Sequence, residues 1–267
     1  MPEQRVEIGG LSFNCRVDGP AGAPWLVFSN SLMTDLSMWD EQVAALAGRH
    51  RILRYDQRGH GGTAVPDHPA TFEELAADAA ALMERFAVER ATFIGISMGA
   101  ATGFFLAARY PSRLARLVAC DGPAKTAPGN QAAWDERIAL AQAGGMAALA
   151  GPTLGRWFTP ASIAADLPVL PKVRAMIEAT PIDGFIACAR ALQSYDITAA
   201  LPGLTLPVLL MAGEKDGALP AALRETAGQI PRARFIEIPA AGHLINLEQP
   251  ASFLSALEPF LAAKPGA

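Results

Sequence analysis

Short apolar runs rich in β-formers alternate with longer stretches of helical periodicity along most of the chain. Two runs, 4–8 and 11–17, are separated by Gly9 and Gly10 and predict an antiparallel hairpin at one sheet edge. Six further runs are continuous enough to be buried strands: 25–29, 51–55, 91–96, 114–120, 208–212 and 234–238. The alternation predicts an α/β fold with a mostly parallel eight-stranded sheet and helices on both faces.

Two helices of this pattern have clear boundaries. Thr71 and Glu74 have the spacing of a capping box, and apolar residues recur on one helical face behind them. A second helix is predicted to begin at Met98 and to run to Tyr110, because Pro111 cannot continue it. This second helix directly follows a predicted strand, so the chain turns sharply between the two.

The alternation of strands and helices fails over 123–198. That segment contains helix-like stretches interrupted by glycine and proline, at Gly144, Gly145, Pro168, Pro171 and Pro181. Because the alternation resumes afterwards, we predict one core formed by 1–122 and 199–267, into which 123–198 is inserted as a helical cap.

Charge and composition narrow the possible partners. The 267 residues carry a net charge of −4 without a basic cluster, which argues against binding to nucleic acid or to an anionic membrane surface. The low net charge is compatible with a small-molecule ligand. The sequence does not indicate the oligomeric state. The polar amino terminus and the lack of a long apolar run predict a protein without signal peptide or membrane span.

Three cysteines, Cys15, Cys120 and Cys188, lie far apart and outside any metal-binding spacing. Neither a disulfide framework nor a structural metal site is therefore expected. A reducing cytoplasm is the predicted location.

The run FIGISMGAA places Gly95, Ser97 and Gly99 in a G-x-S-x-G pattern between a predicted strand and a predicted helix. A serine at such a turn holds its hydroxyl out at the sheet edge, and the glycines allow close backbone packing. The positive end of the following helix favours developing negative charge. We predict that Ser97 is a catalytic nucleophile; the alternative is a glycine-rich turn with a helix-capping serine.

A serine nucleophile needs a base that takes its proton. Of the four histidines, His50, His60, His68 and His243, the last follows the final predicted strand in the loop AAGHLINLEQP. Loops at this sheet edge can reach Ser97, whereas the alternative for His243 is a solvated loop residue. We predict His243 as the base.

The acid that orients the base is expected from another loop at the same edge. Asp216 follows the strand VLLMA in AGEKDGALP and completes the chain order Ser, Asp, His. Glu214 and Asp121 also follow predicted strands and remain alternatives.

The oxyanion of an acyl-transfer reaction needs two N–H donors. One is expected to be the backbone N–H of Met98, directly after the nucleophile, and the other that of Leu32 in the loop after strand 25–29. Asn30 and Ser31 precede Leu32 and can also cap the next helix.

The segment LRYDQRGHGGT has neither the G-x-G-x-x-G spacing nor the Walker spacing of phosphate-binding loops. We interpret it as a structural turn in which Asp56 and Arg58 form a hydrogen-bonded pair. His60 is expected to be a turn residue.

Taken together, SNSLMTDLSMW, LRYDQRGHGGT, GISMGA, AGEKD and AGHLINLEQP resemble the α/β-hydrolase superfamily over essentially the whole chain, and more closely the 3-oxoadipate enol-lactonases. Asn30 and Ser31 are distinctive, since most members of the superfamily have His-Gly there. Trp134 and Arg137 match the W-x-x-R-I pattern of the lactonases. The resemblance implies hydrolysis of a lactone in the β-ketoadipate pathway, without a cofactor, and substrate contacts from these four residues.

A substrate with a carboxylate would need a cationic partner, which Arg137, Lys125 or Arg190 could supply. The alternative for each is a solvated helix face. The chain departs from the lactonases where Met33 replaces glycine and where Asp121 begins Asp-Gly-Pro instead of Asn-Thr. Both positions lie near the expected pocket.

Other functions fit the same motifs. A broad carboxylesterase or a cofactor-free perhydrolase uses the same three catalytic residue types. A receptor that binds a small molecule without turnover can also share the fold.

Overall fold

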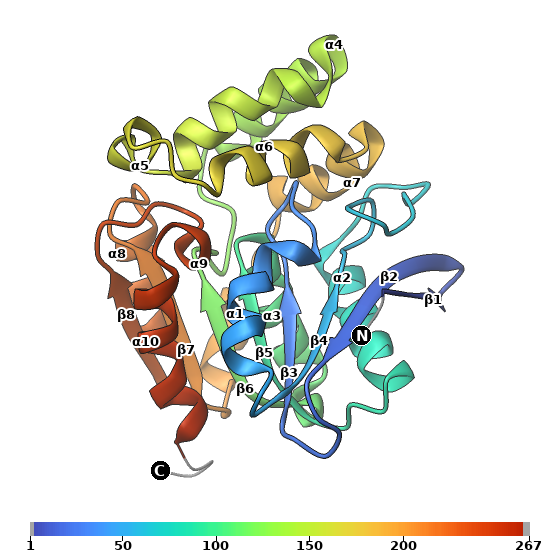
Figure 1. Ribbon diagram of the computed structural model, residues 1–267, viewed down its shortest axis with the longest axis vertical. Coiled ribbons are helices and arrows are strands. Elements are labelled where there is room, and N and C mark those ends of the chain that lie inside the picture. The colour runs from blue at the N-terminus through green and yellow to red at the C-terminus, as the bar shows by residue number, and fades with distance from the viewer. Residues whose placement is uncertain (1–2, 264–267) are drawn as a thin grey trace.

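Eight strands form one sheet in the order β1-β2-β4-β3-β5-β6-β7-β8, within residues 3–263 that the computed structural model describes (Figure 1). They are β1 (Gln4–Ile8), β2 (Leu11–Asp18), β3 (Trp25–Ser29), β4 (Arg51–Tyr55), β5 (Ala91–Ile96), β6 (Leu114–Cys120), β7 (Val208–Gly213) and β8 (Ala233–Ile238). β2 pairs antiparallel with β1 and β4, and the other neighbours are parallel. The mostly parallel eight-stranded sheet is confirmed.

Helices cover both faces of this sheet, with α1 and α10 on one face and α2 and α3 on the other (Figure 1). The core helices are α1 (Asp40–Leu46), α2 (Phe72–Arg85), α3 (Met98–Arg109), α8 (Leu219–Gln229), α9 (Ile245–Glu248) and α10 (Pro250–Ala262). Short 3-10 helices are η1 (Leu36–Trp39), η2 (Pro111–Arg113) and η3 (Thr198–Gly203). None of the helices in the described part of the chain has the length and apolar character to cross a membrane.

Burial of the central strands explains their continuous apolar runs. Every residue of β5 and of β7 is buried, so these strands have no solvated face. Each fully buried large apolar side chain contributes about 1.5–3 kcal/mol of transfer free energy.

At the start of α2, Thr71 Oγ1 accepts the Glu74 N–H and the Glu74 carboxylate accepts the Thr71 N–H, which confirms the predicted capping box.

Four α-helices lie between β6 and β7 in the sequence and form a layer above the sheet (Figure 1). They are α4 (Asn130–Trp157), α5 (Pro160–Ala164), α6 (Leu170–Ala179) and α7 (Ile182–Gln193). The interruption expected at Pro171 is wrong, because this proline lies in the first turn of α6, where its missing N–H leaves no hydrogen bond unmade. α4 continues past Gly145 but changes direction there, with a φ of 71°.

The predicted Asp56–Arg58 pair is also wrong. The Arg58 guanidinium donates two hydrogen bonds, of 2.7 and 2.8 Å, to the carboxylate of Asp78 on α2. The Asp56 carboxylate instead accepts the backbone N–H groups of Leu36 and Gly62, at 2.6 and 2.8 Å. The two side chains of this turn therefore hold different segments, because the long Arg58 side chain reaches α2 while the short Asp56 side chain is occupied by nearby backbone N–H groups.

Candidate active site

Ser97 occupies a strained turn between β5 and α3, with φ 56° and ψ −114°. Positive φ is unfavourable for a serine and persists only where the surrounding structure enforces it. The flanking glycines enforce it by close packing: a Cβ atom at Gly95 would overlap the Gly99 carbonyl, and one at Gly99 would overlap that of Ser29. The G-x-S-x-G pattern thus positions the serine hydroxyl at the edge of the sheet.

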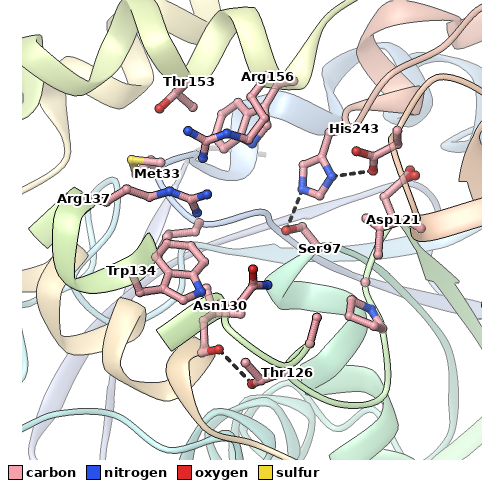
Figure 2. Close-up of a pocket in the computed structure, with 18 of the residues that line it drawn as sticks. Met33, Ser97, Asp121, Thr126, Asn130, Trp134, Arg137, Thr153, Arg156 and His243 are labelled. Atoms are coloured by element: carbon pink, nitrogen blue, oxygen red, sulfur yellow. Dashed lines mark hydrogen bonds and ion pairs between the residues drawn. The ribbon is translucent and has the colours of Figure 1, made fainter. Parts of the chain in front are cut away.

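The Ser97 hydroxyl makes no capping bond to α3, so the capping-serine alternative does not hold. Its Oγ lies 2.8 Å from Nε2 of His243, and Nδ1 of that imidazole lies 2.7 Å from Asp216 Oδ2 (Figure 2). Imidazole and carboxylate are only 14% and 12% exposed. In the tautomer that satisfies both contacts, Nδ1–H donates to Asp216 and Nε2 accepts the serine proton.

The end of α4 holds the histidine loop. The backbone N–H of His243 donates to the Trp157 carbonyl at 2.7 Å, and the two rings stack with centroids 6.1 Å apart. One oxygen of the buried Glu248 carboxylate accepts the Gly242 N–H at 2.6 Å. The other accepts both the N–H and the hydroxyl of Thr159, at 2.8 and 2.7 Å. Cap and catalytic loop are therefore joined by the His243–Trp157 backbone hydrogen bond and by the Glu248 carboxylate.

The other histidines lie outside the cavity around Ser97. His50 Nδ1 is 3.4 Å from a backbone carbonyl of α1, and His68 contacts Asp67 and Glu74 at the surface. His60 is fully buried in its turn, as expected, with Nδ1 3.0 Å from the Arg58 carbonyl.

The three candidate acids have different contacts in the structure. Glu214 accepts the Ala240 N–H at 2.9 Å and pairs with Lys215, away from the imidazole. Asp121 is fully buried beside Asp216, and its Oδ1 accepts the Gly213 N–H at 2.8 Å. Burial, and next the charge of Asp216, raise the pKa of Asp121 well above its usual range. Of the three, the carboxylate in contact with the histidine is that of Asp216.

The loop after β3 reaches the cavity through a tight turn. Thr34 N–H donates to the Ser31 carbonyl at 3.3 Å, and Met33 has a φ of 60°, which is the geometry of a type II turn over 31–34. Leu32 and Met33 line the cavity. Met98 is the first residue of α3, where backbone N–H groups lack helical partners.

Direct substrate contact from the Asn30 side chain does not fit the structure. Its Oδ1 accepts the Trp39 indole N–H at 3.0 Å, and its Nδ2 donates to the Tyr55 carbonyl at the same distance. The side chain is 1% exposed, so it fixes the loop backbone rather than facing a ligand. Ser31 is equally buried and is not among the residues lining the cavity.

A cavity of about 240 Å³ lies between the core and the cap and contains Ser97, Asp216 and His243 (Figure 2). It is smaller than the ~300–1,000 Å³ typical of drug-sized ligands, so it fits a compact molecule. Trp134 and Arg137 line it, whereas Lys125 and Arg190 do not. The lining residues that the motifs did not indicate include Thr126, Asn130, Thr153, Arg156, Trp157, Leu192, Tyr195 and Leu219.

Arg156 is the main residue that sequence reasoning missed. It lies beyond the bend at Gly145, so the helical periodicity before the bend does not indicate which way its side chain points. In residues 3–263, no group of three or more His, Cys, Asp or Glu side chains is arranged as a metal site.

Comparison with known proteins agrees with this geometry. Residues 24–250 match the family model described as alpha/beta hydrolase fold, and the chain belongs to the α/β-hydrolase family. It is 33% identical over 248 residues to 3-oxoadipate enol-lactonase 2 of Acinetobacter baylyi, which covers 93% of this chain and 92% of that protein.

Two solved structures extend the comparison. The enol-lactonase from Burkholderia xenovorans superimposes with a TM-score of 0.93 at 38% identity, covering 97% of this chain and 100% of that one. A thermophilic esterase from Thermogutta terrifontis, solved with malate bound, gives a TM-score of 0.90 at 28% identity and covers 98% of each chain.

Proposed function

We propose that this α/β hydrolase cleaves a lactone or ester bond through an acyl-enzyme on Ser97. The observation that carries the proposal is the position of His243, whose two ring nitrogens lie 2.8 Å from Ser97 Oγ and 2.7 Å from Asp216 Oδ2. In this order the imidazole can take the proton of the hydroxyl, and the carboxylate orients the imidazole. The three groups together therefore form an activated serine nucleophile.

In the first step His243 takes the Ser97 proton while Oγ attacks the substrate carbonyl. The N–H groups of Leu32 and Met98 stabilise the oxyanion, and Asp216 stabilises the imidazolium. The imidazolium then gives its proton to the leaving oxygen, which opens the ring of a lactone. In the second step His243 activates a water that attacks the acyl-serine and releases the acid.

The proposed substrate is the enol-lactone of 3-oxoadipate, an intermediate of aromatic degradation. Two relatives named as enol-lactonases, each covering more than nine-tenths of this chain, support this choice. The compact cavity suits a small ring. The three cysteines are free thiols, which agrees with action in a reducing cytoplasm.

A substrate panel tests the proposal. We expect the wild-type protein to hydrolyse the enol-lactone with a higher kcat/KM than simple aryl esters, and a fluorophosphonate probe to label Ser97 on intact-protein and peptide mass spectra. A His243→Ala variant serves as control, because loss of the base should suppress labelling. Labelling that is absent from Ser97 in the wild type would contradict the mechanism and favour a non-catalytic receptor.

A broad carboxylesterase is the second candidate, favoured by the likeness to the thermophilic esterase. Aryl esters would then be hydrolysed faster than the lactone. Peroxide-dependent halogenation in the same panel would indicate a perhydrolase.

A further inference from the structure

Two arginines from opposite halves of α4 line the active-site cavity. Arg137 precedes the bend at Gly145 and Arg156 follows it. They stand nineteen residues apart, which on a straight helix corresponds to about 28 Å along the axis. The bend brings both into one cavity, and Figure 2 shows the two side chains converging on the same part of it.

Neither guanidinium forms a hydrogen bond or an ion pair with another side chain in residues 3–263. The Arg137 group lies over the Trp134 ring, 4.4 Å from its centroid. Burial, with a smaller contribution from Arg156, lowers the pKa of Arg137 to about 10. Burial also lowers the pKa of Arg156. The charge of Glu136 acts on Arg137 in the opposite direction but more weakly than burial and Arg156. Both positive charges are thus partly removed from water without a carboxylate in hydrogen-bond or ion-pair contact among the described residues.

Other arginines of the cap are paired. Arg190 donates to Asp135 and Gln193, each at 2.7 Å, and Arg174 lies 3.5 Å from Glu178. Of the four arginines within 123–198, the two without such a partner are therefore the two that line the cavity.

An anion between these guanidinium groups would relieve their mutual repulsion and supply the missing partner. The planar fork of a guanidinium matches the two oxygens of a carboxylate, and several arginines can share one such group. Because the same small cavity contains Ser97 and His243, this anion and the scissile ester belong to one compact molecule.

We propose that Arg137 and Arg156 jointly bind a carboxylate of the substrate, so that the enzyme selects lactones and esters that carry a free carboxylate. The inference rests on the proposed hydrolase function of Ser97, and it gives Arg156 a binding role that no sequence motif indicated. The Trp134 ring contacts the Arg137 guanidinium and helps to hold it in the cavity.

Matched esters test this selectivity. Mono(4-nitrophenyl) glutarate carries a free carboxylate, and its methyl ester is the neutral analogue. In Arg137→Gln and in Arg156→Gln, we expect kcat/KM for the charged ester to fall about 10- to 100-fold, mainly through KM, while the neutral ester changes less than about threefold. Arg174→Gln removes a cap charge outside this cavity and should change neither. Equal losses on both esters, or no loss, would overturn the proposal.

Binding of glutarate, followed by calorimetry, separates this inference from the hydrolase function. We expect the wild type to bind glutarate, each arginine variant to lose that binding, and added salt to weaken it. If glutarate binds through both arginines but neither ester is hydrolysed, the anion site stands and the hydrolase function fails. If the neutral ester is hydrolysed but glutarate binding is absent or independent of the arginines, the anion site is wrong and the hydrolase function stands.

Discussion

Asp121 Oδ1 accepts the backbone N–H of Gly213 at 2.8 Å, which links the carboxyl ends of β6 and β7 directly beneath the candidate catalytic acid. Asp121 is fully buried and lies next to Asp216. Two carboxyl groups this close do not ionise together easily, so one of them keeps its proton. Burial and the charge of Asp216 raise the pKa of Asp121 well above its usual range, so we expect Asp121 to be the member that keeps its proton.

Asp121→Asn should therefore keep activity, because an amide has the shape and the donor of a protonated carboxyl. We expect kcat/KM within about threefold of wild type, whereas Asp216→Asn should lose about three to four orders of magnitude in kcat. Steady-state kinetics with an aryl ester checks both. Activity in Asp216→Asn together with inactivity in Asp121→Asn would move the acid to the β6 loop.

The same substitution changes the pH dependence of stability. An unfolded aspartate ionises near about pH 4, while the raised pKa of Asp121 keeps its proton bound in the folded state at higher pH. The folded state then binds more protons than the unfolded state, so this residue lowers stability as pH rises above about 4. Relative to wild type, Asp121→Asn should gain unfolding free energy between about pH 5 and 8 in urea titrations. A difference that shrinks with rising pH would show an ionised Asp121.

Met33 has a backbone conformation that should lower the free energy of unfolding. It holds a φ of 60° in a turn position that favours glycine, and its side chain is 4% exposed and lines the cavity. Met33→Ala keeps the unfavourable backbone and loses the side chain, and Met33→Gly loses both. We expect the free energy of unfolding of Met33→Gly to be about 1 kcal/mol higher than that of Met33→Ala.

Both substitutions at Met33 should widen the cavity. We expect kcat/KM for 4-nitrophenyl octanoate, relative to the acetate ester, to rise about tenfold, since a pocket discriminates methylenes by about 1–3 kcal/mol. An unchanged ratio would show that the side chain does not limit substrate size.

Loss of the bidentate contact between Arg58 and Asp78 is expected to lower the free energy of unfolding strongly. Both side chains are 10% exposed, so removing one partner leaves a buried charge unpaired. Arg58→Met should lower the free energy of unfolding by about 3 kcal/mol or more. The double variant Arg58→Met, Asp78→Leu should recover part of that loss. A single-variant loss below about 0.5 kcal/mol in urea titrations would contradict a buried, coupled pair.

Glu248 holds the His243 loop to the cap through its two carboxylate oxygens. Glu248→Gln replaces one acceptor oxygen by an NH₂ group that faces another donor, which should loosen the loop. We expect kcat to fall about tenfold with little change in KM, and about 1–3 kcal/mol less unfolding free energy. Glu258→Gln, which changes an exposed carboxylate on α10, is the control. Unchanged kcat in Glu248→Gln would show that the loop is held by other contacts.

Features encoded locally could be predicted from the sequence. The strand runs, the capping box and the turn at Ser97 each depend on residues within a few positions, and the order of the loops placed His243 and Asp216 at one edge. The Asp78 partner of Arg58 comes from a separate helix, so no local pattern indicated it.

The site residues that were predicted wrongly or missed depend on three-dimensional geometry that a sequence pattern does not contain. The family resemblance implies a substrate contact from Asn30, but this side chain turns inward to Trp39, and Leu32 and Met33 of the same loop line the cavity instead. Arg156 joins the site through the change of direction at Gly145, where the φ and ψ angles of one residue depart from helical values.

The most direct test of the central claim is hydrolysis of 3-oxoadipate enol-lactone by wild-type protein and by Ser97→Ala, measured side by side with thermal unfolding of both. We predict efficient turnover by the wild type and a loss of at least about three orders of magnitude in kcat for a variant that remains folded. Near wild-type turnover by folded Ser97→Ala would contradict the acyl-enzyme account.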